Sequence, residues 1–238
     1  MSNNESQVLA GQKALVQQVG TRFSADWKSR NHRERRLLSE FIGTSGLTFV
    51  LSGGAAILAG YGGAELAPYQ FAFILSTIAA LWLVAVVYFL GEISTHFNPA
   101  MTLAFTLRGD MGWPMAVIYM VVQFIAAASG SCLAAWLFGT GGNLAATIPQ
   151  PGMMWQAVVL EAILTFGMIL LVLSMANGPK LSGNFIPLAI GAYVMAMGTM
   201  GGPFEGAAFN PARAFGPDFA RGDFTTYWVY PAGSLIGV

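Results

Sequence analysis

The tripeptide Asn-Pro-Ala occurs twice in this chain, as Asn98-Pro99-Ala100 and as Asn210-Pro211-Ala212. Each copy follows a phenylalanine and lies within very apolar sequence. A helix-breaking dipeptide is tolerated at membrane depth only where the freed backbone is buried in protein or lines a water-filled cavity. Two copies of one break therefore predict two halves of one pore, with the functional site at the breaks.

The composition is that of a membrane protein. Hydrophobic residues make up 55% of the chain and charged residues only 9%, whereas about a quarter of the residues in soluble domains are charged. A helix needs about 20 apolar residues to cross a bilayer. We expect an all-α membrane protein with spans at 38–60, 70–90, 113–138, 154–175 and 185–201, and a sixth that starts near Tyr227.

The sixth block ends at Val238, after only twelve residues. An α-helix rises about 1.5 Å per residue, and the hydrocarbon core is about 30 Å thick. We therefore expect that the C-terminal part of the last span is missing from this chain.

The positive charges predict the orientation. Seven of the eleven Lys and Arg residues precede the first span, and Lys180 lies between the fourth and fifth. The loops at 61–69 and 139–153 carry no Lys or Arg and fit the outer side. By the positive-inside rule, residues 1–37 form a cytoplasmic N-terminal tail. This tail has no apolar core of the kind that a cleavable signal requires, so the first span should act as its own insertion signal. We expect a multi-pass protein of the plasma (inner) membrane.

The chain is also duplicated outside the tripeptides. Glu-x-x-x-Thr begins at Glu40 and recurs 121 residues later at Glu161, and a weaker echo pairs Gln123 with Pro231. Residues 38–138 and 154–238 each read as span, span, broken loop, span. Because three spans is an odd number, the second half must be inserted upside down. The sequence predicts one channel domain, residues 38–238, built as an inverted repeat with a site at the midplane.

Glu40 and Glu161 occupy matching places in the two repeats. A carboxylate inside a span is costly and by default functional. We expect both to accept hydrogen bonds from the two broken loops. The alternative is that they lie near helix ends and are solvated.

Each tripeptide is typical of a helix start, because Asn is a favoured N-cap and Pro is favoured at the first helical position. The segments 100–108 and 212–220 are long enough for about half the hydrocarbon thickness. Entering from opposite faces, the two re-entrant half-helices would meet at the midplane. Each helix start carries about half a positive charge, and the asparagine amides offer N–H donors. The two half-helices are expected to let neutral molecules pass and to reject cations. The alternative is that the two tripeptides are turns in unrelated loops.

These motifs resemble the major intrinsic protein family, the aquaporins and aquaglyceroporins. The most specific elements are residues 97–102 and 209–213, with Arg213 after the second tripeptide only and Gly216-Pro217 beyond it. The resemblance covers the chain from about residue 38 to its end. It implies six tilted transmembrane helices plus two half-helices per subunit, and a homotetramer with one pore in each subunit.

The resemblance also implies an outer constriction, the selectivity filter. Its arginine matches Arg213, and two further positions match Ala207 and Gly198. The position in the second span stays open between Ala79 and Ile78, because this chain is one residue shorter than the family before its first tripeptide. Such a filter lacks the His of strict water channels and the bulky aromatic pair of glycerol channels, so the opening should be wide.

Other markers conflict over the permeant. Trp82 could narrow the opening, or it could face lipid or a neighbouring helix. Ala214 and the pair Tyr227-Trp228 resemble water channels, whereas Asp218 supports neither class.

For each of three polar residues, the sequence leaves two roles open. Arg213 either offers donors to a permeating oxygen and repels cations, or forms an ion pair with Glu205 or Asp218. Glu205 either binds Arg213 or is a solvated carboxylate of the outer vestibule. His96 resembles the family histidine of the inner mouth, where it either gates the pore by titrating near neutral pH or makes structural hydrogen bonds.

The sequence therefore favours a passive channel for water that excludes ions and protons. A wide facilitator for glycerol, urea or metalloid hydroxides is the alternative, and a secondary transporter a more distant one. No enzyme motif, metal-ligand cluster or cofactor signature is found, and Cys132 is the only cysteine. We expect the lipid bilayer and small neutral solutes as partners, and no nucleic acid.

Overall fold

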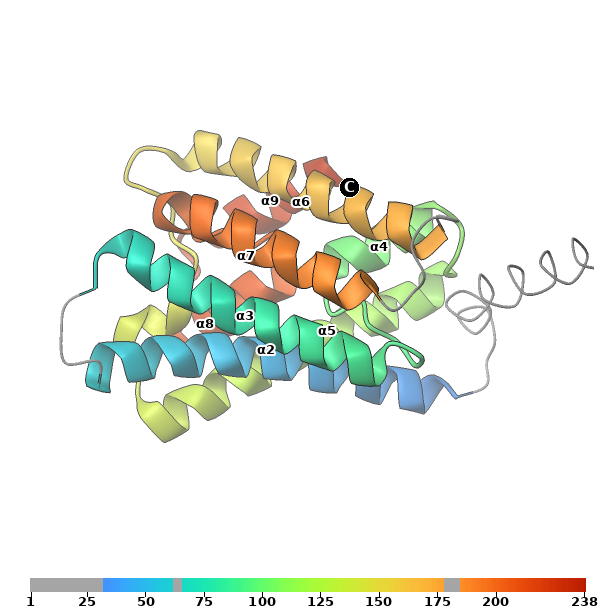
Figure 1. Ribbon diagram of the computed structural model, residues 1–238, viewed down its shortest axis with the longest axis horizontal. Coiled ribbons are helices and arrows are strands. Elements are labelled where there is room, and N and C mark those ends of the chain that lie inside the picture. The colour runs from blue at the N-terminus through green and yellow to red at the C-terminus, as the bar shows by residue number, and fades with distance from the viewer. Residues whose placement is uncertain (1–31, 62–65, 178–184) are drawn as a thin grey trace, which may run out of the picture.

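The computed structural model describes residues 32–61, 66–177 and 185–238, and the regular secondary structure in this part of the chain is all helical, without a strand (Figure 1). The long helices are α2 (Arg33–Tyr61), α3 (Pro68–Leu90), α5 (Trp113–Phe138), α6 (Met154–Asn177) and α7 (Ile186–Glu205). The shorter elements are α4 (Pro99–Leu107), the 3-10 turn η1 (Gly141–Ala145), α8 (Pro211–Arg221) and α9 (Val229–Gly237).

The predicted architecture of six spans and two half-helices is confirmed. In the described part of the chain, four helices are long and apolar enough to cross a membrane: α2, α3, α5 and the Met154–Met175 part of α6. The first span begins at Arg33 rather than at residue 38, so its first turns carry basic residues. The tail before His32 and the loop with Lys180 lie outside the described residues, so the orientation that they predict stays a prediction.

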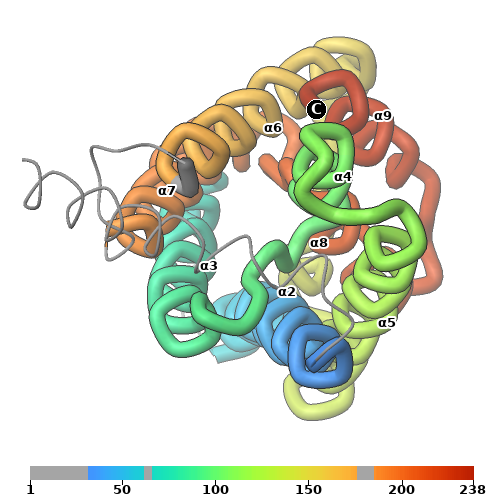
Figure 2. The backbone as a smooth tube through the Cα atoms, turned by 90° about the vertical axis from the view of Figure 1, so that its right-hand side faces the viewer, coloured from blue at the N-terminus to red at the C-terminus, as the bar shows by residue number. Residues whose placement is uncertain are grey.

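The long helices surround the two short ones. Figure 2 looks along the bundle and shows α4 and α8 inside a ring made by α2, α3, α7, α6, α9 and α5. Within the first half α2 packs on α5, within the second α6 packs on α9, and α3 packs on α7 between the halves. This pairing is the arrangement that an inverted repeat predicts.

Small residues let α2 and α5 approach closely. A Cβ on Gly130 would overlap the main chain of Ser45, and Thr48 Oγ1 donates to the Ala127 carbonyl at 3.0 Å. Membrane helices associate through such close packing and interhelical hydrogen bonds, because lipid gives them no hydrophobic driving force.

The weaker sequence echo, which paired Gln123 with Pro231, has the wrong register. Gln123 Nε2 donates to Glu40 Oε2 at 2.8 Å. The residue that makes the matching contact in the second half is Ser234, whose Oγ donates to Glu161 Oε1 at 3.3 Å. Ser234 lies about one helical turn beyond Pro231, so a match of residue types alone pointed to the wrong turn.

Candidate functional site

A cavity of about 500 Å³ reaches both tripeptides. Its walls come from α2, α3, α4, α6, α7, η1, the start of α8 and the loops that precede α4 and α8. Most of the lining is apolar, and none of the described residues that line it is Asp or Glu. The polar side chains on its wall are Ser76, Thr95, His96, Asn98, Asn143, Asn210 and Arg213.

Both tripeptide asparagines cap a helix as expected. Asn98 Oδ1 accepts the Ala100 N–H at 2.8 Å. Asn210 Oδ1 accepts the N–H groups of Ala212 and Arg213 at 3.1 and 3.2 Å. The prolines that follow occupy the first helical positions of α4 and α8. The two helix starts therefore present their N–H groups at the same cavity.

The two caps are also joined to each other. Asn98 Nδ2 donates to the Phe209 carbonyl at 2.7 Å, and Asn210 Nδ2 donates to the Phe97 carbonyl at 2.8 Å. Phe97 and Phe209 have φ values of +50° and +33°, a region that non-glycine residues rarely adopt. The strained backbone turns each carbonyl toward the opposite half. An amide carries two N–H groups, so each asparagine keeps one for a molecule in the cavity.

Two buried acids hold the loops. Glu40 accepts the His96 N–H on Oε1 at 2.8 Å and the Phe97 N–H on Oε2 at 2.7 Å. Glu161 Oε2 accepts the Ala208 N–H at 3.2 Å. Both acids have 0% exposure, so the alternative of solvated helix ends is wrong. Glu40 thus fixes the two residues that precede Asn98, and Glu161 fixes one of the two that precede Asn210.

The expected filter residues gather at the cavity. Ala207, Gly198, Arg213 and Ala79 all line it. Ile78 is not among the lining residues, and its side chain lies toward α2, where a Cβ on Gly54 would meet its Cδ1 at 3.1 Å. Of the two residues left open in the second span, Ala79 is the one that lines the cavity.

Two nearby side chains differ in whether they reach the cavity. Trp82 does not narrow the cavity; it packs on Gly46 of α2 and donates Nε1–H to the Gly43 carbonyl at 3.1 Å. Ser76 was missed by the sequence analysis although it lines the cavity, and a Cβ on Gly198 would meet its Cβ at 3.0 Å. A spacing of three residues from Ala79 along one helix face was the available signal.

Arg213 is held by a main-chain carbonyl. Its Nη1 donates to the Ala145 carbonyl at 2.9 Å, and its exposure is 9%. Asn143, Leu144 and Ala145 form a run with φ between +50° and +57°. Ser52 Oγ fixes this run by donating to the Leu144 carbonyl at 2.9 Å. Arg213 and Ala145 are 68 residues apart, and no sequence pattern predicted this hydrogen bond.

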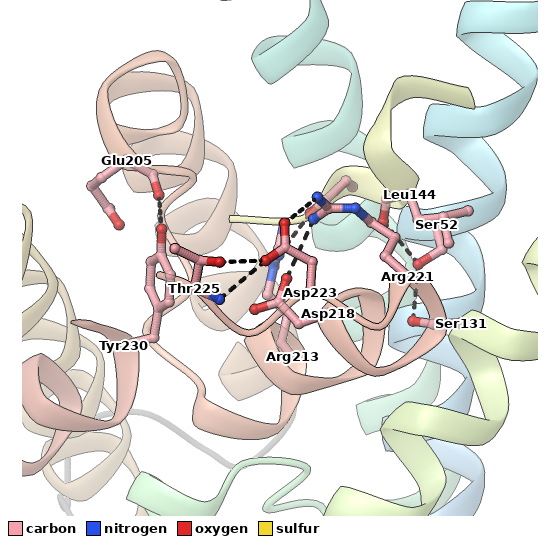
Figure 3. Close-up of polar contacts among 11 residues, drawn as sticks. Ser52, Ser131, Leu144, Glu205, Arg213, Asp218, Arg221, Asp223, Thr225 and Tyr230 are labelled. Atoms are coloured by element: carbon pink, nitrogen blue, oxygen red, sulfur yellow. Dashed lines mark hydrogen bonds and ion pairs between the residues drawn. The ribbon is translucent and has the colours of Figure 1, made fainter. Parts of the chain in front are cut away.

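Three carboxyl groups lie around the arginine without pairing with it directly. Glu161, Glu205 and Asp218 interact electrostatically with Arg213, but among the described residues none comes within 4.0 Å of its nitrogens. Asp218 instead pairs with Arg221 at 3.5 Å (Figure 3). The alternative that Glu205 is a solvated vestibule carboxylate is wrong, because it is 0% exposed.

His96, also on the cavity wall, packs among aromatic rings. It stacks on Phe105 with centroids 4.7 Å apart and an interplanar angle of 16°. Its Nδ1 lies 3.1 Å from Thr102 Oγ1. Phe105 also lines the cavity and was missed by the sequence analysis. These contacts favour the structural alternative for His96 over the gating one.

No group of three or more His, Cys, Asp or Glu side chains that could hold a metal is found in the described ranges.

Comparisons with known proteins agree on one family. A family model described as Major intrinsic protein matches residues 27–238. Aquaporin NIP1-1 of Zea mays is 33% identical over 208 residues, which cover 85% of this chain and 71% of the relative. Probable aquaporin TIP2-2 of Oryza sativa subsp. japonica is 34% identical over 209 residues, which cover 84% and 81%.

A solved structure has the same fold. The X-ray structure of the aquaglyceroporin from Plasmodium falciparum superimposes with a TM-score of 0.68 over 86% of this chain and 92% of that chain. The sequences are 20% identical, so this likeness concerns the fold alone.

Proposed function

Because this chain belongs to the major intrinsic protein family, we propose that it conducts water and small uncharged solutes passively across a membrane. The observation that carries this proposal is the pair of asparagine-capped helix starts that meet, cross-linked, in one cavity. A permeating oxygen can accept the remaining asparagine N–H groups there, so a neutral hydrogen-bonding molecule replaces part of its hydration.

Ions are rejected by the same groups. The two helix starts each contribute about half a positive charge, and Arg213 adds a full one at the filter. No carboxylate from the described residues lines the cavity, so a passing cation meets no acidic ligand there. The half-helix ends therefore oppose hydronium and metal cations at the point where a neutral molecule is bound.

A specific observation favours solutes larger than water. Three of the four filter residues, Ala79, Gly198 and Ala207, have no side chain beyond a methyl group. Pore diameter and lining donors decide which neutral molecules pass. A polar solute of the size of glycerol, urea or a metalloid hydroxide fits this filter as the second candidate permeant.

The protein is integral to a membrane, as its apolar helices and its family require. We propose the finer assignments on the charge distribution and the family resemblance: a plasma-membrane homotetramer with a cytoplasmic N-terminus, a channel domain over residues 38–238, and outer and inner pore ends at Arg213 and His96. The family consists of channels rather than enzymes, and we assign no catalytic step and no ion coupling to the chain.

Stopped-flow light scattering on proteoliposomes tests the permeant. Vesicles are first shrunk with an impermeant osmolyte and then exposed to glycerol or urea. We expect fast shrinkage and then fast solute entry. Ala79→Phe should lower glycerol and urea entry about tenfold or more by narrowing the filter. Ile78→Phe is the matched control and should stay within about twofold of wild type. Equal solute entry in both variants would contradict the filter assignment.

A further inference from the structure

The two halves of the pore differ in a pair of charged residues. The third residue after Asn210 is Arg213, whereas the third after Asn98 is Met101. The fifth residue before Asn210 is Glu205, whereas the fifth residue before Asn98 is Ile93, or Ser94 if the one-residue gap of the first loop is counted; neither is charged. The arginine and the additional acid thus occur together in one half and are both absent from the other.

Glu205 is fully buried beside the filter loop. Its exposure is 0%, and its Oε1 accepts the Ala207 N–H at 2.9 Å. Its main-chain carbonyl accepts the Tyr230 hydroxyl at 2.6 Å, as Figure 3 shows. Its Oε2 is also buried and has no hydrogen-bond partner among the described residues. A buried carboxylate oxygen without a partner is costly unless a nearby positive charge compensates it.

Arg213 is the cation available to compensate that carboxylate. Glu205 and Arg213 interact electrostatically, and Arg213 lies on the cavity wall. The other cation drawn nearby, Arg221, is paired with Asp218 at 3.5 Å and with Asp223 at 3.0 Å (Figure 3).

Glu161 also interacts with Arg213, but its presence has another explanation. It is the repeat equivalent of Glu40, which holds the first loop although Met101 stands there in the place of the arginine. The role shared by Glu40 and Glu161 is therefore loop support. The third acid, Asp218, is paired with Arg221, which leaves Glu205, among the described residues, as the acid that accompanies Arg213 and has no other cation as a partner.

The backbone that Glu205 holds is part of the filter. Ala207 lines the cavity and has a φ of +46°, a conformation that costs free energy for a residue with a Cβ. The bond from its N–H to Glu205 is one of the contacts that keep it there. Glu205 thus reaches the filter in two ways, through the Ala207 backbone and through the charge of Arg213.

We propose that Glu205 is a positioning residue of the filter: it fixes Ala207 and supplies the counter-charge that keeps Arg213 from attracting anions into the pore. The proposal rests on the channel function proposed above. It extends that function by explaining how a wide filter with a positively charged wall excludes anions as well as cations. The field of a charge in a low-dielectric wall is strong, so its compensation by a buried carboxylate affects every ion that approaches.

Replacing Glu205 by Gln separates the two roles, because the amide oxygen can still accept the Ala207 N–H while the charge is lost. Anion entry is measured as swelling of proteoliposomes in potassium nitrate with valinomycin, which makes the anion rate-limiting. We expect Glu205→Gln to raise nitrate entry about tenfold and to keep more of the wild-type water permeability than Glu205→Ala does. Glu205→Ala should raise nitrate entry and also lower water permeability, because Ala207 loses its anchor.

Two variants serve as controls. Glu92→Gln removes one exposed acid elsewhere and should not change nitrate entry. Glu205→Gln combined with Arg213→Met, which copies the first half of the chain, should abolish the gain in nitrate entry. The proposal is overturned if Glu205→Gln matches wild type in nitrate entry, or if the gain persists without Arg213.

A stability cycle tests the same pair without any transport. Arg213→Met alone leaves Glu205 buried without its counter-charge and should lower the thermal unfolding midpoint in detergent. Adding Glu205→Gln should recover part of that loss, and a double variant no more stable than Arg213→Met would also overturn the proposal. Because this readout needs no flux, wild-type vesicles that fail to conduct water would contradict the proposed function and still leave Glu205 testable.

Discussion

The guanidinium of Arg213 is oriented by a neutral group. An arginine side chain has five N–H donors, and one of them is used by the Ala145 carbonyl. The other donors can face a molecule in the cavity that Arg213 lines. The motif predicted which arginine this would be, but not its partner, because the Ala145 carbonyl is placed by a left-handed run of backbone that local sequence does not indicate.

Arg213→Val tests what this side chain does for permeation. We expect faster entry of solutes larger than glycerol and weaker rejection of cations, because the variant removes both bulk and positive charge from the filter. Entry is measured by stopped-flow light scattering with a series of polyols, and cation leak by the decay of a potassium gradient. Unchanged solute entry would show that Arg213 does not line the constriction.

Glu40 and Glu161 differ in how well a neutral amide can replace them. Glu40 accepts from Ser94 Oγ and the His96 N–H on one oxygen, and from the Phe97 N–H and Gln123 on the other. A glutamine in either orientation would set its NH₂ group against a backbone N–H. The partners of Glu161 are the Ala208 N–H and a serine hydroxyl that can reverse its role.

Glu40→Gln should therefore cost about 2–3 kcal/mol, the range for a buried donor left unsatisfied. Glu161→Gln should cost about 1 kcal/mol or less. Thermal unfolding in detergent measures both variants against wild type. The expected order is wild type, then Glu161→Gln, then Glu40→Gln as the least stable; equal midpoints for the two variants would contradict the hydrogen-bond assignment.

The two half-helices were the most predictable elements. The Asn-Pro start predicted segments 100–108 and 212–220, and the helices are Pro99–Leu107 and Pro211–Arg221. Capping depends on residues that are neighbours in sequence, so it could be predicted locally. The bond from Asn98 to the Phe209 carbonyl spans 111 residues and became visible only in three dimensions.

Asn98→Ser and Asn98→Ala separate capping from cross-linking. Serine keeps an oxygen for the helix start but has no amide N–H for the Phe209 carbonyl, whereas alanine loses both. Loss of a cap costs about 1 kcal/mol, and a buried carbonyl left without its donor costs about 1–3 kcal/mol. We expect thermal midpoints in the order wild type, Asn98→Ser, Asn98→Ala. A serine variant as stable as wild type would show that the cross-link contributes no stability.

Taken as a whole, the molecule follows its duplicated sequence. Apolar blocks, one repeated motif and an odd number of spans per half predicted the helical inverted repeat that the structure has. The walls of the cavity were harder to predict. Ser76, Trp82 and Glu205 took their places through packing between distant helices, because the direction of a side chain around a membrane helix depends on its neighbours.

The central claim is that two oppositely inserted, asparagine-capped half-helices form one pore that passes neutral molecules and rejects ions. The most direct measurement records osmotic water permeability, its activation energy and potassium and proton conductance on the same proteoliposomes. The account predicts faster water flow with a lower activation energy than in protein-free vesicles, and no added ion conductance. Water flow equal to that of protein-free vesicles, or ion conductance that rises with protein content, would contradict it.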